Sequence, residues 1–355
     1  MRLYFITNSI KNSKNANTIQ TLNMLKSFND LDVKVHSFWF VKRIYPSITE
    51  DQILIPKIKF GSVVYAFICT TYIKIHNLFY SKEMLVYSRS FYASYFLSFF
   101  KKSKLIFEVH SIPNSFGRHI FKKVLESKNV HIISISHALS NKLYQKYNVQ
   151  NTINVLPDAH PLSKRLIEEK MSAIKFKRYE KIRVGYYGSL KDYKGFSIIR
   201  DLILNHSDEF DFIIRSKEKL DKDLASLCKK SGYISHSEAI SEMETCNCLL
   251  MPLNKTGKFN DISEVTSPLK LFEYLSSGVP VVASDSEVLK EIITHDHDAF
   301  LANNYKDFYD SIKKVSENDE HIQKIIFNAL ETSLKYTYKE RANRVLEIFK
   351  NLNDE

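Results

Sequence analysis

The feature that most constrains the fold is an alternation of short apolar runs with longer amphipathic stretches along the whole chain. Each run has the length of a buried β-strand, and each intervening stretch has the length of a helix. Strand followed by helix, repeated many times, indicates parallel sheets wound by right-handed crossovers, with helices on both faces. The expected strands are residues 3–7, 33–39, 85–88, 105–109, 131–136, 153–156, 182–187, 210–215, 248–251 and 280–284.

The alternation stops near Pro157 and resumes at Ile182. At 355 residues the chain is long enough for two domains. We therefore expect an α/β protein with two doubly wound, Rossmann-like domains facing across a cleft, residues 1–160 and 182–337, joined by a linker over 161–181. Apolar residues at helical spacing in 338–355 predict a closing helix that can pack back on the first domain.

The net charge of +11 is unevenly distributed. Residues 1–165 carry 23 Lys+Arg against 8 Asp+Glu, whereas residues 166–355 carry 28 against 32. A basic half can attract nucleic acid, anionic lipid or a phosphorylated acceptor, and a solvated lysine-rich surface is the simpler interpretation. No nucleic-acid recognition module accompanies the charge, so we expect no nucleic acid as a partner.

Four scattered cysteines indicate reduced thiols, and no uncharged apolar run reaches 18 residues. We therefore expect a cytoplasmic protein that contacts a membrane, if at all, from its surface. Residues 90–104 combine aromatic side chains with a lysine cluster, which suits the inner face of the cell membrane or a lipid-linked acceptor. A crossover helix with an apolar inner side explains the same stretch.

Two segments carry candidate chemistry. The first, residues 185–195, runs from an expected strand into a helix through Gly188, Ser189, Lys191, Lys194 and Gly195. Glycine lets the backbone approach a ligand and lysine can neutralise a phosphate. A plain turn explains this segment equally well.

The second segment is residues 266–285, in which Ser267 is an expected N-cap and Pro268 suits the first helical position. Free backbone N–H groups between Ser267 and Leu269, with the helix dipole behind them, can hold a diphosphate without a metal. Glu273, further along the helix, can accept hydrogen bonds from two sugar hydroxyls, although a surface acid is the simpler interpretation.

Together these segments resemble the retaining glycosyltransferases of family 4, which have the GT-B fold. The residues that carry the resemblance are 187–189 with Lys194 and Gly195, then 232–238 and 266–285, with weaker matches at 86–89, 107–110 and 135–138. The resemblance implies transfer of a sugar from a nucleotide-diphosphate sugar, with retention at the anomeric carbon. It implies no metal or other cofactor and suggests a role in making cell-surface polysaccharide from a glycan or lipid-linked acceptor.

The family's functional residues transfer position by position. Lys194 matches the lysine that binds the donor diphosphate, Glu273 the glutamate that holds the nucleotide ribose, and His110 a histidine near the reacting sugar. The expected donor-binding set is Gly188, Ser189, Lys191, Lys194, Thr266, Ser267, Leu269, Lys270 and Glu273.

The chain departs from the family pattern twice. Val265 stands where the family's first glutamate falls, and Ser189 stands where the family has an arginine. Lys191 or Lys270 is a candidate to supply the missing cation. These departures keep open a protein that binds a nucleotide sugar or a glycan without catalysis, and a GT-B epimerase is a third possibility.

Weaker candidates are Arg89 and His137, which follow expected strands of the first domain and could contact an acceptor. The run from His295 to Asp298 has metal-ligand residue types, but four neighbours on a short connection indicate a polar turn. We therefore expect no metal site.

Overall fold

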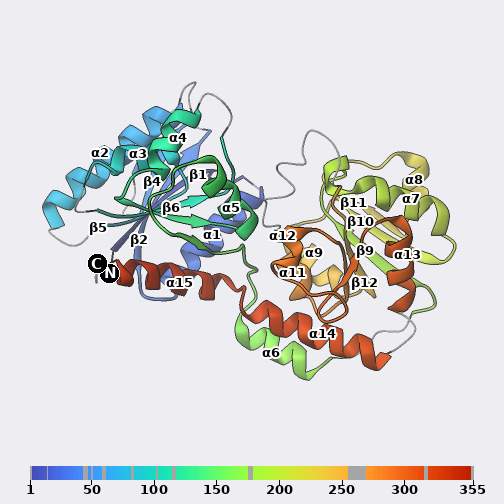
Figure 1. Cartoon of the computed structure of the whole chain (residues 1–355). Helices are drawn as coiled ribbons and strands as arrows, with labels where there is room; N and C mark the ends of the chain where they lie inside the picture. The colour runs from blue at the N-terminus through green and yellow to red at the C-terminus, as the bar shows by residue number, and fades with distance from the viewer. Residues whose placement is uncertain are drawn as a thin grey trace. The chain divides into compact units, whose positions relative to one another are not determined.

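The computed structural model describes residues 2–13, 15–42, 47–48, 51–57, 61–80, 84–100, 103–113, 117–174, 179–254, 269–315 and 319–352. The chain divides into two compact units, each with its own sheet (Figure 1). One unit comprises Met1–Pro157 with Tyr338–Glu355, and the other comprises Asp158–Thr337. The expected class, two parallel-sheet α/β units, is confirmed.

The first unit is built on a sheet with strand order β3-β4-β2-β1-β5-β6-β7-β8. All neighbours are parallel except β3, which runs antiparallel to β4. In Figure 1, α2, α3 and α4 lie on one side of these strands and α15 on the other, where it packs against α1. The elements are β1 (Arg2–Ile10), α1 (Ala16–Asn29), β2 (Lys34–Val41), β3 (Ser47–Ile48), β4 (Gln52–Pro56), α2 (Gly61–Tyr80), β5 (Met84–Ser88), α3 (Phe91–Leu97), β6 (Ser103–Val109), α4 (Arg118–Leu125), β7 (Val130–Ser134), α5 (His137–Lys146), β8 (Ile153–Val155) and α15 (Tyr338–Asn351).

The second unit has six parallel strands in the order β11-β10-β9-β12-β13-β14. Its elements are α6 (Lys164–Ser172), β9 (Ile182–Tyr187), the 3₁₀ turn η2 (Asp192–Lys194), α7 (Phe196–His206), β10 (Phe210–Arg215), α8 (Lys222–Ser226), β11 (Lys230–Gly232), α9 (His236–Met243), β12 (Cys248–Met251), α11 (Leu269–Leu275), β13 (Val281–Ser284), α12 (Glu287–Lys290), β14 (Phe300–Ala302), α13 (Tyr305–Lys314) and α14 (Asp319–Leu334).

Helices cover both faces of the second sheet. Successive side chains of a strand point to opposite faces, so a strand with apolar residues throughout needs a cover on each face. Val184 and Tyr186 of β9 pack in one apolar cluster with α7 and α13. Tyr187, on the opposite face, packs in a second cluster with α9, α11 and α12. β9 is therefore covered on both sides, which explains why it reads as a continuous apolar run.

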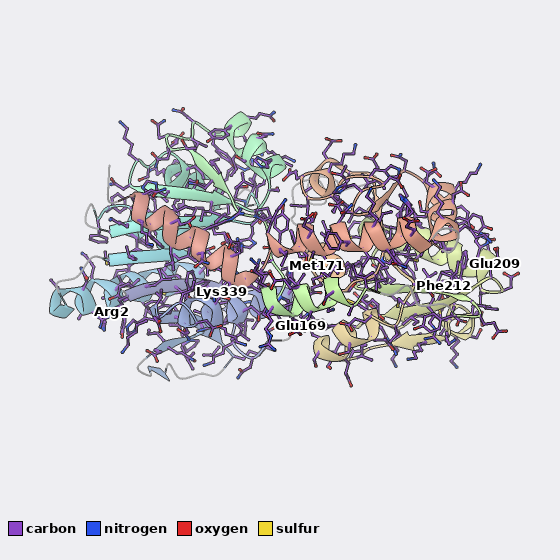
Figure 2. All side chains as sticks on the ribbon, turned by 90° about the horizontal axis from the view of Figure 1, so that it is seen from below. Arg2, Glu169, Met171, Glu209, Phe212 and Lys339 are labelled. Atoms are coloured by element: carbon purple, nitrogen blue, oxygen red, sulfur yellow. The ribbon has the colours of Figure 1, made fainter. Side chains whose placement is uncertain are left out.

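The segment 161–181, where we expect a linker with some helix, contains α6 of the second unit. Its helix α6 packs beside α14, and Figure 2 shows α6 with Glu169 and Met171 on it. Ile167 is fully buried in the second unit's core. The alternation of charged and apolar residues therefore marks an amphipathic helix with one core-facing side.

The observed boundary lies between Pro157 and Asp158, and the chain returns to the first unit at Tyr338. No helix in the described ranges has the length and apolar content needed to cross a membrane.

Candidate active site

The second sheet changes its direction of winding between β9 and β12, its two central strands. Open parallel sheets bind ligands at such a point, beyond the carboxyl ends of the strands. Gly188 follows β9 directly, and Pro252 follows β12. The glycine-containing segment predicted from the sequence therefore lies at the position where this topology forms a ligand crevice.

Gly195 fixes the path of this segment. It has a φ of 72°, in the left-handed region, and it ends η2 where α7 begins. A Cβ atom at this position would lie 2.6 Å from Cβ of Pro252. Only glycine satisfies both conditions, so it packs the turn after β9 closely against the end of β12.

Lys270, in the first turn of α11, reaches into the space that a side chain at Gly188 would fill. Its Nζ lies 2.7 Å from the position of a Cβ atom at Gly188 and 4.2 Å from the centroid of the Tyr186 ring. Burial lowers the pKa of Lys270 to about 7, with a further lowering from the Lys194 ammonium, while Glu273 acts in the opposite direction.

Lys194, on η2, is half-buried. Burial, together with the charge of Lys191, lowers its pKa. Within the described ranges, neither Lys194 nor Lys270 forms a salt bridge. Two desolvated ammonium groups with no carboxylate partner among these residues make an electrostatic environment that favours an anion.

Glu273 has a partner that was not predicted as a site residue. Its Oε1 lies 2.7 Å from Nε2 of His236, the first residue of α9. Ser235 and Glu238 form a capping box that fixes the start of this helix. The hydrogen bond to Glu273 raises the pKa of His236. His236 lies in the segment 232–238, which carried part of the family resemblance, and this was the sequence signal that could have identified it.

Three further residues of the expected donor set lie around this site. The carbonyl oxygen of Ser189 accepts a hydrogen bond of 2.6 Å from the Tyr186 hydroxyl. Lys191 is exposed, and Leu269 is the first residue of α11. Thr266 and Ser267 lie outside the described residues.

In the first unit, the corresponding change of winding lies between β1 and β5. A cavity of about 230 Å³ opens there, at the carboxyl ends of β1, β5 and β6. Asn8, Arg89, Glu108 and His110 line it with aromatic and small polar side chains. The structure therefore brings Arg89 and His110 to one cavity.

Glu108, beneath His110, is fully buried between two arginines. Its Oε1 lies 3.0 Å from Nη2 of Arg89, and its Oε2 lies 3.0 Å from Nη2 of Arg341. The same carboxylate contacts Nε2 of His110. Burial alone would raise the pKa of Glu108, but Arg341 and His110 outweigh that effect and lower it. The charge of the Glu108 carboxylate is therefore compensated by the protein itself, and with two guanidinium groups the cluster keeps a net positive charge.

Arg341 reaches this group from α15, 233 positions further along the chain than Glu108. It also donates a 2.8 Å hydrogen bond from Nε to the carbonyl of Pro157 and a 3.1 Å hydrogen bond to the Tyr87 hydroxyl. It therefore anchors the returning C-terminal helix to β6, the strand that carries Glu108.

His137 is not among the residues that line this cavity. It is exposed at the first position of α5, behind the N-cap Ser136. The run 295–298 forms a turn in which Asp298 accepts a 2.7 Å hydrogen bond from the Thr294 amide. In the described part of the chain, no group of three or more His, Cys, Asp or Glu side chains could hold a metal ion.

Comparison with known proteins agrees with this architecture. Residues 212–332 match the family model for glycosyl transferases group 1. A search of curated protein sequences finds no match to this chain.

Among solved structures, sucrose-phosphate synthase from Thermosynechococcus elongatus is 12% identical with a TM-score of 0.71 over 99% of both chains. HepE of Anabaena, crystallised with UDP-glucose, is 14% identical with a TM-score of 0.67 over 99% of this chain and 100% of that one. A glycosyltransferase from Rickettsia africae ESF-5 is 15% identical with a TM-score of 0.70 over 99% and 98%. The fold of the chain is GT-B.

Proposed function

We propose that this chain is a retaining glycosyltransferase of family 4 that transfers a sugar from a nucleotide-diphosphate sugar to a glycan or lipid-linked glycan. The observation that carries the proposal is the buried Lys270 ammonium packed against Gly188, where the charge of Lys194 also acts on it. The family match over 212–332 and the UDP-glucose bound by HepE support a nucleotide sugar as the donor.

The chemistry follows from where charge develops. Breaking the bond between the anomeric carbon and the diphosphate leaves growing negative charge on the leaving group. Lys194 and Lys270 would stabilise that charge, because preorganised cations act most strongly where water is excluded. Lys270 would supply the cation that Ser189 does not, and no divalent metal is required.

Glu273 would accept hydrogen bonds from the ribose hydroxyls, and His236 would hold its carboxylate in place. His110 would lie near the reacting sugar, on the carboxylate of Glu108. The acceptor would attack on the face from which the diphosphate leaves, its hydroxyl proton passing to that leaving group. No base from the protein is needed for this step.

For this protein we propose a location in the cytoplasm, on the inner face of the cell membrane, and a role in making cell-surface polysaccharide. The first unit would bind the acceptor.

Val265 in place of the family's first glutamate favours a second candidate, a protein that binds a nucleotide sugar without catalysis. Purified protein incubated with a panel of nucleotide sugars separates the two. Release of UDP or GDP that increases with an added glycan acceptor supports transfer. Binding without any product, as seen by thermal protection alone, supports the second candidate.

A further inference from the structure

Helix α2 of the first unit is apolar on two sides. Its inner side buries Tyr65, Cys69 and Ile73 completely. A surface helix normally has one apolar side and one polar side. A helix that is apolar all round is normally covered by protein or by lipid.

The outer side of α2 carries large apolar residues at helical spacing. Phe67 is 62% exposed, Ile75 is 52% exposed and Leu78 is 80% exposed. Val63, Val64 and Ile68 are exposed on the same helix. Residues separated by three, four, seven or eight positions lie on one helix side, so these side chains form a stripe along its length.

The stripe continues onto the end of α3. Phe99, which follows that helix, is 65% exposed. The rest of α3 is buried or half-buried, so the aromatic stretch at 90–104 serves largely as a crossover helix. An apolar groove of about 760 Å³ lies between the two helices and is lined by Phe67, Ile75, Leu78, Phe99 and Phe100, among others.

Charge indicates what covers this surface. From residue 57 to residue 104 the sequence carries eight Lys+Arg and a single acidic residue, Glu83. Two of the eight, Arg89 and Lys104, have buried side-chain nitrogens and do not contribute to this surface. The first unit as a whole has 25 Lys+Arg against 11 Asp+Glu, whereas the second has 26 against 29. Lys74 lines the groove with its ammonium 4.0 Å from the centroid of the Phe100 ring. Long cationic side chains over an apolar surface are typical of the boundary between lipid headgroups and acyl chains.

From this apolar stripe and its cationic surroundings we infer that the outer side of α2, together with Phe99, docks on an anionic membrane surface. The apolar side chains enter the headgroup region, and Lys74 binds the anionic headgroups. This inference rests on the proposed membrane location but not on sugar transfer. Docking would bring the protein to an acceptor that cannot leave the bilayer.

Co-sedimentation of the full chain with vesicles tests the docking surface. The wild-type protein should bind vesicles of phosphatidylcholine with phosphatidylglycerol, bind much less to phosphatidylcholine alone, and detach as salt is raised. The triple variant Phe67→Ser, Leu78→Ser, Phe99→Ser should bind at least about tenfold more weakly. Lys74→Gln should weaken binding by about fivefold.

The matched control is Leu204→Ser with Phe327→Ser, which removes exposed apolar side chains of the second unit and should leave vesicle binding unchanged. All substituted apolar residues are exposed, so thermal unfolding should confirm that each variant is folded. Equal binding to neutral vesicles, equal loss in the control, or no binding by the wild type would overturn the inference. A concentration-dependent increase in mass that the triple variant abolishes, without vesicle binding, would assign the surface to a second copy of this chain instead.

The variant Lys194→Ala, Glu273→Ala keeps this test separate from the proposed activity. It should bind vesicles like the wild type and fail in transfer. Normal transfer to a soluble glycan by the triple variant would show that its defect is one of docking alone.

Discussion

The carboxyl ends of the two sheets hold charge in opposite ways. In the first unit, Glu108 is enclosed by Arg89, Arg341 and His110, so the protein supplies its own counter-ions. In the second unit, the charge of Lys194 lowers the pKa of Lys270, and neither lysine forms a salt bridge among the described residues. A carboxylate that is compensated by buried cations stabilises and positions the elements it joins, whereas ammonium groups that no carboxylate compensates are unfavourable until an anion binds. We therefore assign a structural role to the Glu108 group and anion recognition to Lys194 and Lys270.

The largest effect is expected at the lysines of the second unit, on the rate of transfer. Lys194→Ala should lower kcat by about a hundredfold to a thousandfold, because it removes a cation from the developing charge of the leaving group. Initial rates of nucleoside diphosphate release measure this. Lys222→Ala, which removes an exposed lysine of α8, is the control and should retain most activity. Full activity of Lys194→Ala would remove the diphosphate site from this position.

Substitution of Glu108 should change the stability of the fold. Glu108→Gln leaves two buried guanidinium groups without their carboxylate, and we expect the free energy of unfolding to fall by about 3 kcal/mol or more. Urea denaturation of the purified variant measures this change. An unchanged denaturation midpoint would mean that Glu108 does not hold the cluster together.

Lys270→Met should shift stability the other way. It replaces a desolvated ammonium with an apolar side chain of similar length, so we expect the unliganded protein to gain about 1 kcal/mol while affinity for UDP or GDP falls. Thermal unfolding with and without the nucleotide measures both changes. A loss of stability comparable to that of Glu108→Gln would show that the two sites do not differ as described.

The pH dependence of nucleotide binding sharpens the same contrast. The pKa of Lys270 is about 7 in the free protein, below its unfolded value, so Lys270 loses its proton as pH rises through 7. An anion binds the protonated form, so affinity should fall above pH 7, by at most about tenfold per pH unit, with proton uptake on binding. Titration calorimetry in buffers of different ionisation enthalpy measures the uptake. Lys270→Arg should flatten the profile, and an unchanged slope in that variant would exclude Lys270 as the titrating group.

The smallest effect is expected at His236. Glu273 holds His236 at a raised pKa, so the pair is an ion pair below that pKa and loses this stabilisation as pH rises through it. His236→Gln should raise KM for the donor by about threefold with little change in kcat, because one neutral hydrogen bond replaces a charge-assisted one. A change confined to kcat would contradict a role in positioning Glu273.

Much of the fold was accessible from the sequence because buried parallel strands are continuous apolar runs. The predicted strands 182–187, 210–215 and 248–251 have the observed bounds of β9, β10 and β12. The short strands β3, β4 and β11 were missed. β3 and β11 lie at the edges of their sheets, where an unbroken apolar run is not required, and β4 lies next to β3.

The site was only partly accessible. Two short sequence motifs were recognisable in the single chain. One contains Gly188 and Lys194, and the other contains Lys270 and Glu273. The pairs Glu108 with Arg341 and His236 with Glu273 join residues 233 and 37 positions apart. No local pattern encodes such contacts, because they depend on how distant strands and helices pack.

The most direct test of the central claim is a crystal structure of the protein with UDP or GDP, grown with EDTA. The account predicts the diphosphate beside the Gly188 turn, with phosphate oxygens about 3 Å from Nζ of Lys194 and of Lys270. A diphosphate bound elsewhere, or bound at this turn only when magnesium is added, would contradict it.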